Sequence, residues 1–424
     1  MLEKLITDFP EHMSRPVNKK LPLQGIRIID FTHFIAGPFA TMILADMGAE
    51  VIKIEAPQRG DDFRQYPPFD DEIGQGAPFL WSNRNKQSLS LDLKTPEGLS
   101  VAQELIKSAD IVVENFSTGV MQRLGLDYES CKVDNPKLIY CSISAYGRNG
   151  SFSDRLGFDP IAQAESGFIS MNGYSDREGV RALSPVMDIG TAMMTSNAIL
   201  GAIVARSQHG IGQTIDISLF DSAVVMSGYA PVQYLFSGKE PQRHGNTSPD
   251  TCPSGAFKAS DRTFYINCGS NKIFQRLACQ VLKLPELAES PEYATVKDRN
   301  KGRDKLFSIL NAEFAKQPWT YWQKSMREAG VPCGLIRTVA EAIRSDEAME
   351  SRVVTRIPHR VKEWVPNISL PIKYSETPLA DPVAAPNVGE HTLEVMKKVL
   401  GYSDMQIDDL QEAGAFGKNF AFGS

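Results

Sequence analysis

The amino-acid sequence predicts an α/β fold, with a large Rossmann-like domain and a smaller α+β domain. A strand, a loop, a helix and a second strand follow one another between Ile26 and Glu55, which is the pattern of a βαβ unit and requires a parallel sheet. Apolar strands and helical segments continue to alternate as far as Ser222. Beyond Ser222 the segments become shorter and include a hairpin, which is typical of a separate α+β domain.

Each element of the large domain is predicted from a local pattern. Pro38 suits the first turn of a helix that Gly48 ends, and Thr95 with Pro96 starts the next helix. A short helix is expected around Met121. The strands are predicted from apolar or alternating runs at 26–31, 51–55, 88–93, 111–114, 138–144 and 214–219.

In a parallel sheet the carboxyl ends of the strands meet at one rim, where ligands bind. We therefore expect the loops Thr32–Gly37, Asn115–Thr118 and Ser144–Gly147 to lie together. The first loop holds a single glycine, Gly37, in place of the G-x-G-x-x-G motif that binds dinucleotides. This difference disfavours a nicotinamide dehydrogenase.

Polar, turn-rich segments indicate the domain boundaries. We predict that residues 1–225 form the first part of the large domain, that residues 226–335 form the small domain, and that residues 336–424 form a linker and a segment that returns to the large domain. The small domain is expected to contain a polar loop, a hairpin, helices and a short strand, at 238–254, 256–268, 271–282, 301–316, 319–328 and 331–336. A last helix is expected at 388–400.

Composition disfavours several classes of partner. With 45 Lys and Arg against 51 Asp and Glu, the net charge is −6, and no basic run indicates nucleic-acid binding. The six cysteines form no C-x-x-C pair, so neither a metal site nor a disulfide scaffold is expected, and a reduced cytoplasmic compartment fits. No apolar run reaches the length of a membrane span and the N-terminus lacks a signal-peptide core, so no membrane partner is expected.

Asp188 precedes a long apolar helix that is predicted to begin at Ile189 and to end at Gly210. An aspartate at this point is ordinarily an N-cap, whose carboxylate faces the free N–H groups of the first turn. It is also a candidate nucleophile, because a carboxylate with an ordinary pKa of about 4 is charged at neutral pH and needs no general base. Gly190 would leave space for a substrate beside it, and the helix start would supply N–H groups.

Sequence motifs from about Leu21 onward resemble those of the class III CoA-transferases, which share a fold with α-methylacyl-CoA racemase. They recur in order as DFTHFIAGPFA (30–40), GAEVIKIEAP (48–57), NKQSLSLDLKTPEG (85–98), ADIVVENFSTGVMQRLGL (109–126), the D-x-G helix start at Asp188, GQTIDISLFD (212–221), AGVPCGLI (329–336) and VGEHT (388–392). Several words in one order are more specific than any single motif.

The resemblance implies an enzyme that moves CoA between an acyl-CoA and a free carboxylic acid through an aspartyl-CoA thioester. Asp188 matches the family's nucleophile. The positions that match the family's CoA contacts are Phe34, Ile35, Ala36, Leu91, Asp92, Leu93, Lys94, Asn115, Phe116, Arg123, Ala145 and Tyr146. The resemblance also implies an interlocked homodimer, and no cofactor or metal besides CoA as cosubstrate.

The chain departs from the formyl-CoA type of this family at three places. Ile35 stands where those proteins have Gln, Ala56 stands where they have Arg, and SPDTCPSG (248–255) occupies the region of their glycine-rich acceptor loop. These departures argue against strict formate or oxalate chemistry, and we expect a dicarboxylic pair such as succinyl-CoA with a C2–C5 diacid. Arg243 and His244, in the polar loop, are candidates to meet the acceptor carboxylate.

Two alternatives remain from the sequence. A 2-methylacyl-CoA racemase needs bases on both faces of its substrate, and racemases carry His in a G-H-D word where this chain has Gly157-Phe158-Asp159. Phenylalanine accepts no proton, which disfavours this alternative. A CoA-binding protein without activity is the other, although Asp188 and its surroundings are intact. His33, after the first strand, is a lesser candidate for catalysis.

Overall fold

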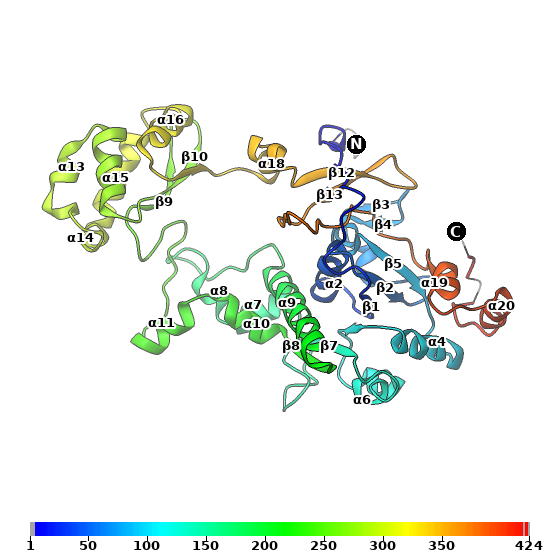
Figure 1. Cartoon of the computed structure of the whole chain (residues 1–424). Helices are drawn as coiled ribbons and strands as arrows, with labels where there is room; N and C mark the ends of the chain where they lie inside the picture. Colours follow the sequence, from blue (N-terminus) through cyan, green and yellow to red (C-terminus); the bar gives the residue numbers. More distant parts are fainter. Residues whose placement is uncertain (1–4, 419, 423–424) are drawn as a thin grey trace. The chain divides into compact units, whose positions relative to one another are not determined.

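A computed structural model describes residues 5–418 and 420–422 of the chain, which forms two compact units (Figure 1). The first unit contains Met1–Phe168, Arg181–Val232 and Asp346–Ser424, and the second contains Ile169–Val180 and Gln233–Ser345. The second unit thus spans 233–345 rather than 226–335, and it includes residues 169–180, which the sequence places in the large domain. Residues 1–4, 419 and 423–424 of the predicted segments lie outside the described residues.

The first unit is built on a six-stranded parallel sheet in the order β5-β2-β1-β6-β7-β8. Its strands are β1 (Arg27–Asp30), β2 (Glu50–Glu55), β5 (Lys86–Ser90), β6 (Ile111–Glu114), β7 (Ile139–Ser144) and β8 (Gln213–Ser218). All six predicted strands are confirmed. The order is that of the doubly wound dinucleotide fold, in which the strand order reverses between β1 and β6 and leaves a crevice at their carboxyl ends.

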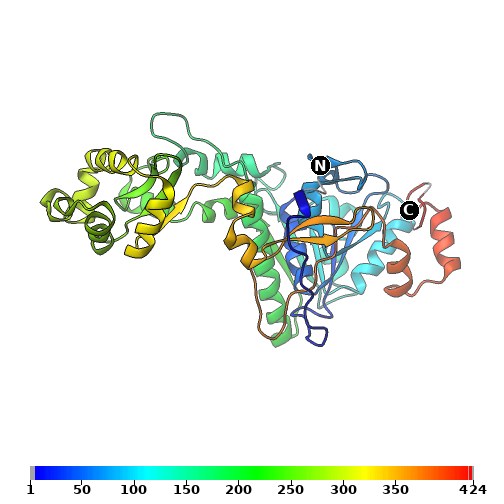
Figure 2. The same cartoon turned by 90° about the horizontal axis from the view of Figure 1, so that it is seen from above.

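Side chains alternate between the two faces of the sheet, so each face has its own apolar core. Ile28 and Val51 pack with α2 (Ala36–Asp46) and α9 (Val186–His209). On the other face, Ile29 and Val112 pack with α4 (Pro96–Lys107) and with the C-terminal helices α19 (Thr392–Lys398) and α20 (Asp404–Glu412). Figures 1 and 2 show these two helices in red, next to α4 in cyan.

The other elements of the first unit are short. They are α3 (Ala77–Asn83), α5 (Val120–Leu124), α6 (Tyr128–Cys131), α7 (Asp159–Glu165), α10 (Leu219–Met226), α18 (Asp346–Ser351), η1 (Asp62–Gln65) and the hairpins β3–β4 (Phe69–Asp70, Gln75–Gly76) and β12–β13 (Val354–Pro358, Trp364–Ile368). Helices α8 (Phe168–Met171) and α11 (Ala230–Ser237) lie where the chain passes from one unit to the other. The sequence does not predict β12–β13, because Pro358 and Pro366 interrupt its strand pattern.

The residues predicted to start or end helices do so in several cases. Thr95 Oγ1 accepts a hydrogen bond from Gly98 N at the start of α4. Gly210, in the left-handed region, ends α9. However, α9 begins at Val186 rather than Ile189, so Asp188 lies inside the first turn and the prediction that it is the N-cap is wrong.

Helix α9 is the one helix, within the described part of the chain, that is long and apolar enough to cross a membrane by length and composition. Its side chains Ala192, Ile199 and Ala202 are buried against the sheet. Packing in the core therefore accounts for the apolar side chains on this face of α9.

The second unit is built on a three-stranded antiparallel sheet in the order β11-β10-β9. Its elements are β9 (Ser254–Lys258), β10 (Thr263–Asn267), α12 (Asn271–Arg276), η2 (Leu277–Leu282), α13 (Pro285–Glu289), η3 (Pro291–Tyr293), α14 (Val296–Lys301), α15 (Arg303–Phe314), α16 (Trp319–Ala329), β11 (Cys333–Leu335) and α17 (Val339–Ile343). The predicted hairpin and final strand are confirmed. Aromatic residues, among them Phe264, Phe314 and Trp322, fill the core between sheet and helices.

Candidate active site

A pocket of about 440 Å³ lies at the carboxyl ends of β1, β6 and β7. The three predicted rim loops supply much of its wall, for example through Phe34, Asn115 and Ala145, and Phe158 and Asp188 also line it. The expectation that these loops lie together is confirmed. Because the strand order reverses here, the pocket occupies the place where doubly wound proteins bind their ligands.

Asp188 lines this pocket from the first turn of α9, where its side chain is partly buried. No hydrogen bond or ion pair of its carboxylate is found among the described residues. Burial raises the pKa of Asp188 to about 7, and the negative charge of Asp159 contributes to the rise. The expectation of a fully ionised carboxylate at neutral pH is therefore wrong, since a group with this pKa is divided between both forms near pH 7.

The N–H groups at the start of α9 already have acceptors. Those of Met187 and Asp188 donate to Asp159 Oδ2, at 2.8 and 3.3 Å. Those on either side donate to backbone oxygens, Val186 to Ser184 and Ile189 to Pro185. The side chain that caps α9 is thus Asp159, the first residue of α7, and the α9 start does not supply free N–H groups to a substrate.

Gly190 serves the packing of α9 against α10. A Cβ atom built on Gly190 would lie 1.6 Å from Met226 Sδ. The glycine therefore makes room for Met226, and the expectation that it clears space beside Asp188 is not supported.

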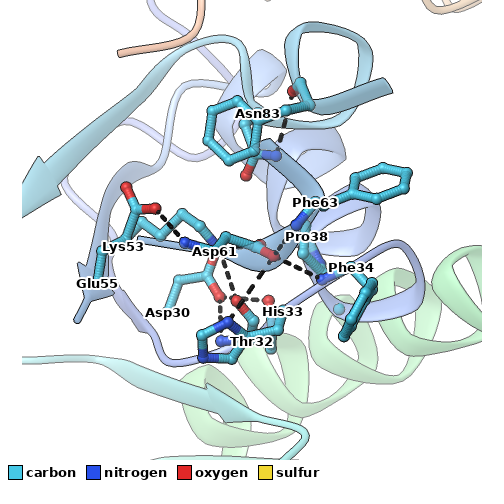
Figure 3. A network of polar contacts seen from close by, with 12 residues as sticks. Asp30, Thr32, His33, Phe34, Pro38, Lys53, Glu55, Asp61, Phe63 and Asn83 are labelled. Atoms are coloured by element: carbon cyan, nitrogen blue, oxygen red, sulfur yellow. Dashed lines mark hydrogen bonds and ion pairs between the residues drawn. The ribbon is translucent and has the colours of Figure 1, made fainter. Parts of the chain in front are cut away.

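Buried polar groups hold the loop that follows β1 (Figure 3). Asp30 Oδ1 accepts from Thr32 N at 2.9 Å, and Lys53 Nζ donates to Thr32 O at 2.5 Å. Asp61 Oδ1 accepts from Phe34 N at 3.2 Å. Phe34 has a φ of 65°, and this left-handed backbone is unfavourable for phenylalanine, so the surrounding bonds must maintain it.

Lys53 and Asp61 form an ion pair with no exposure to solvent, and their charged atoms lie 3.0 Å apart. Burial by itself raises the pKa of Asp61, but Lys53 and His33 lower it well below its ordinary range. Burial likewise lowers the pKa of Lys53, whereas Asp61, Asp30 and Glu55 raise it above its ordinary value. Both groups are therefore charged at neutral pH, and each depends on the other.

A second pocket, of about 780 Å³, lies beside the carboxyl ends of β2 and β5. Four predicted CoA contacts line it, namely Leu91, Asp92, Leu93 and Lys94. Two cations that the sequence does not single out, Arg59 and Lys418, also line it. His33, Asp62 and Phe116 belong to the walls of both pockets, so the two pockets are neighbours.

The other predicted CoA contacts divide into two groups. Phe34, Ile35, Ala36, Asn115, Phe116 and Ala145 line the first pocket. Arg123 and Tyr146 line neither pocket: Arg123 is exposed on α5, and the Tyr146 hydroxyl donates to Glu165 Oε2 at 2.7 Å. The guanidinium of Arg155, which lines the first pocket, lies 4.6 Å over the Tyr146 ring. Tyr146 therefore supports the pocket wall from outside.

His33 lies where the two pockets meet. Its backbone is fixed by the Asn115 side chain, which accepts from His33 N and donates to His33 O, each at 2.9 Å. Its ring packs on Phe116, with 5.4 Å between centroids. The imidazole is thereby held against the wall of both cavities.

Arg243 of the polar loop makes hydrogen bonds that stabilise the second unit. Its guanidinium donates to the carbonyl oxygens of Ser170, Tyr174 and Arg177, at 2.9, 3.2 and 2.8 Å. These bonds fasten residues 169–180 to the loop, so the expectation that Arg243 meets an acceptor carboxylate is not supported. The acceptors lie 66 to 73 residues away in the sequence, which local patterns do not reveal.

No group of three or more His, Cys, Asp or Glu side chains that could hold a metal ion is found among residues 5–418 and 420–422. That CoA is the only cofactor stays a prediction.

Comparisons with known proteins agree with this fold. Residues 23–392 match the family model described as CoA-transferase family III. The succinyl-CoA:glutarate CoA-transferase of Mus musculus is 36% identical over 397 residues, which cover 93% of this chain and 90% of that protein. The acetyl-CoA:oxalate CoA-transferase of Acetobacter aceti is 38% identical over 331 residues, which cover 77% and 84%. The crystal structure of a CAIB/BAIF family protein from Brucella suis has 34% sequence identity and a TM-score of 0.81, and the match covers 90% of this chain and 100% of that one. The chain belongs to CoA-transferase family III and is a CoA-transferase.

Proposed function

We propose that the enzyme moves CoA between succinyl-CoA and a second dicarboxylic acid, with Asp188 as the nucleophile. The observation that carries the proposal is the Asp188 carboxylate, which lines the first pocket with no partner among the described residues. The mouse relative is named for succinyl-CoA and glutarate, which supports this pair of substrates. Oxalate belongs in the test as well, because the Acetobacter relative is named for it.

Transfer takes place by exchange at a single carboxylate. The Asp188 carboxylate attacks the thioester carbonyl of succinyl-CoA, the C–S bond breaks, and a succinyl-aspartyl anhydride and CoA thiolate result. The thiolate attacks the aspartyl carbonyl, which releases succinate and leaves aspartyl-CoA. The acceptor acid then carries out the same two steps in reverse, and no net proton is consumed.

The environment of Asp188 suits this role. Its pKa of about 7 makes the carboxylate more basic than an ordinary aspartate, and a more basic, poorly solvated carboxylate is the stronger nucleophile. Because it lacks hydrogen-bond partners among the described residues, its oxygens are available to the thioester. Transfer should increase with pH as Asp188 ionises.

The donors that stabilise each oxyanion must come from outside α9, because the first N–H groups of that helix have other acceptors. Helix α2 begins at Ala36, on the wall of the first pocket. The first N–H groups of a helix have no acceptor within it. We assign the oxyanion site to this helix start.

We propose that CoA occupies the second pocket, with its reactive sulfur toward His33 and the first pocket. Lys94 and Arg59 supply positive charge for its phosphates. Arg123 and Tyr146, which line neither pocket, are given no contact with CoA in this proposal.

We propose that the working form is a homodimer, as the family resemblance implies. Met193 and Val204 on α9 and Val225 on α10 are apolar side chains with 51%, 54% and 62% of their surface exposed. A second chain that covers them would remove this apolar surface from water. Sedimentation should give a dimer, and a stable, active monomer would contradict this.

Thioester exchange tests the proposed function. The enzyme is incubated with succinyl-CoA and glutarate, oxalate or formate, and new CoA thioesters are identified by mass spectrometry. Asp188→Ala should abolish exchange and leave CoA binding, measured by calorimetry, nearly unchanged. Hydroxylamine added during turnover should label the peptide from Ala182 to Arg206. Near-normal exchange by Asp188→Ala would disprove the mechanism.

Racemisation of a 2-methylacyl-CoA is not proposed. It requires a second base. At the position of the racemase histidine this chain has Phe158, whose side chain forms an apolar part of the pocket wall. Its ring lies edge-on to Phe34, with 6.2 Å between centroids. Incubation with a single enantiomer should leave its configuration unchanged.

A further inference from the structure

Asp159 is a buried carboxylate next to the proposed nucleophile. Only 4% of its surface is exposed. Its Oδ2 accepts the N–H groups of Met187 and Asp188, at 2.8 and 3.3 Å. No salt bridge of Asp159 with Lys, Arg or His is found among the described residues. A buried carboxylate without a counterion needs another reason to be retained, since its burial is costly.

Gln163 fixes the orientation of this carboxylate. Gln163, fully buried one turn along α7, donates from Nε2 to Asp159 Oδ1 at 2.5 Å. Its Oε1 accepts from Ala182 N at 2.8 Å. A series of hydrogen bonds thus runs from Ala182 through Gln163 and Asp159 to the start of α9. Each bond in the series has a donor opposite an acceptor, which fixes the geometry of the two side chains.

This arrangement removes the stabilisation that a carboxylate in the first turn of a helix ordinarily receives. The free N–H groups of the first turn favour a negative charge there and lower the pKa of a carboxyl group. In α9 those of Met187 and Asp188 are directed to Asp159 instead. Asp188 therefore faces a second negative charge and has no donor of its own among the described residues.

We propose that Asp159 is a positioning residue for the transfer reaction. It holds the first turn of α9 by accepting hydrogen bonds from the N–H groups of Met187 and Asp188, and it adds a negative charge near Asp188. Both effects keep the Asp188 carboxylate unpaired and strongly nucleophilic. This proposal rests on the proposed role of Asp188. The other charged or titratable side chains of the same pocket are His33, Asp62, Arg148, Asp154 and Arg155. Both arginines are paired elsewhere, Arg148 with Glu114 and Arg155 with Glu165.

The proposal is tested with Asp159→Asn and with the double variant Asp159→Asn/Gln163→Glu. In the single variant the new amide N–H₂ faces the N–H₂ of Gln163, so some loss of stability is expected. The double variant restores a donor opposite an acceptor, because the carboxylate introduced at position 163 can accept both from the amide introduced at position 159 and from Ala182 N. It keeps the net charge but moves the negative charge one side chain farther from Asp188.

Three measurements separate positioning from simple capping. The thermal midpoint of the double variant should return toward that of the wild type. The acidic limb of kcat/KM against pH should lie about one pH unit or more lower in both variants, and the plateau should fall about tenfold or more, because Asp188 becomes a weaker base and nucleophile. CoA affinity should stay within about twofold in both variants.

Two outcomes would overturn the proposal. One is an acidic limb that does not move in the folded double variant. The other is a double variant with the plateau activity of the wild type, which would mean that Asp159 serves only as a cap. Asp188→Ala distinguishes these outcomes from failure of the proposed function: if that variant remains active, the nucleophile is wrong, whereas an inactive Asp188→Ala with an unmoved limb in the Asp159 variants rejects only the positioning role.

Discussion

Lys53 Nζ lies 3.0 Å from Asp61 Oδ2, and neither side chain is exposed to solvent. Lys53 also donates to Thr32 O, and Asp61 accepts from Phe34 N, so the pair holds two points of the loop on the pocket wall. A pair of charges so deep in the protein adds little net stability, but the loss of one partner leaves the other uncompensated. The pair therefore links the stability of the first unit to the shape of its pocket.

Lys53→Met should destabilise the first unit by about 3–5 kcal/mol, because the Asp61 carboxylate is left buried without its counterion. Unfolding in urea measures the change. Lys107→Met is a matched control in the same unit: Lys107 pairs with Asp134 at the surface, so its loss should cost about 0–1 kcal/mol. Adding Asp61→Asn to Lys53→Met should recover part of the loss, and a double variant that is less stable than Lys53→Met would contradict the argument.

Asp188→Asn should stabilise the protein at alkaline pH. An unfolded aspartate has a pKa of about 4, whereas Asp188 has a pKa of about 7 in the fold. The folded state thus binds the proton more tightly, so this contribution to stability is full below pH 4 and is lost as the pH rises through 7. Asparagine cannot ionise and avoids the loss.

The expected gain at pH 8 is about 1–3 kcal/mol in the free energy of unfolding, reduced from the full linkage value because the side chain is partly exposed. At pH 4.5 the two proteins should differ by less than about 0.5 kcal/mol. Urea titrations at both pH values provide the comparison. A wild type that is the more stable of the two at pH 8 would show that the carboxylate is stabilised in the fold, contrary to the structure.

The sheet and the rim of the site could be predicted from the sequence because they depend on local patterns. The strand at Ile111–Glu114 is a short apolar run, and a parallel sheet brings Asn115 at its end to the same rim as the loop after Asp30. The class of reaction could likewise be predicted from the sequence motifs that include Asp188. These features need no knowledge of which distant segments meet.

The contacts that tune the site could not be predicted, because they join segments far apart in the chain. Asp159 lies 28 residues before Met187, and its capping role exists only because α7 packs beside α9. A lysine within a strand is ordinarily exposed, but Lys53 is buried because helices cover both faces of the central sheet. Arg59 carries no signal in the sequence for its place on the second pocket.

Arg299→Lys should destabilise the second unit by about 2–4 kcal/mol. The Arg299 guanidinium is fully buried and donates to Cys252 O at 2.6 Å, Tyr293 O at 2.9 Å and Asn271 Oδ1 at 3.0 Å. A single ammonium group cannot reproduce this fork. Hydrogen exchange should locate the loss of protection in the second unit. Arg327→Lys, at an exposed position of α16, is the control and should show no change; equal stability of the two variants would reject the argument.

Gly190→Ala should destabilise α9 although alanine favours a helix. Its Cβ would meet Met226 Sδ at 1.6 Å, so the methionine must leave its place and the packing of α10 on α9 is disturbed. We expect a net cost of about 1–2 kcal/mol, which is the cost of overpacking less the gain of about 1 kcal/mol in helix propensity.

Gly201, in the same helix, provides a control. A Cβ atom at Gly201 would have nothing within 4 Å, so Gly201→Ala should instead stabilise the protein by about 0.5–1 kcal/mol. In the Met226→Ala background the cost of Gly190→Ala should vanish, because the space is then free. Urea unfolding of the four proteins in this cycle gives the coupling energy, and a value below about 0.5 kcal/mol would mean that Met226 is not the obstacle.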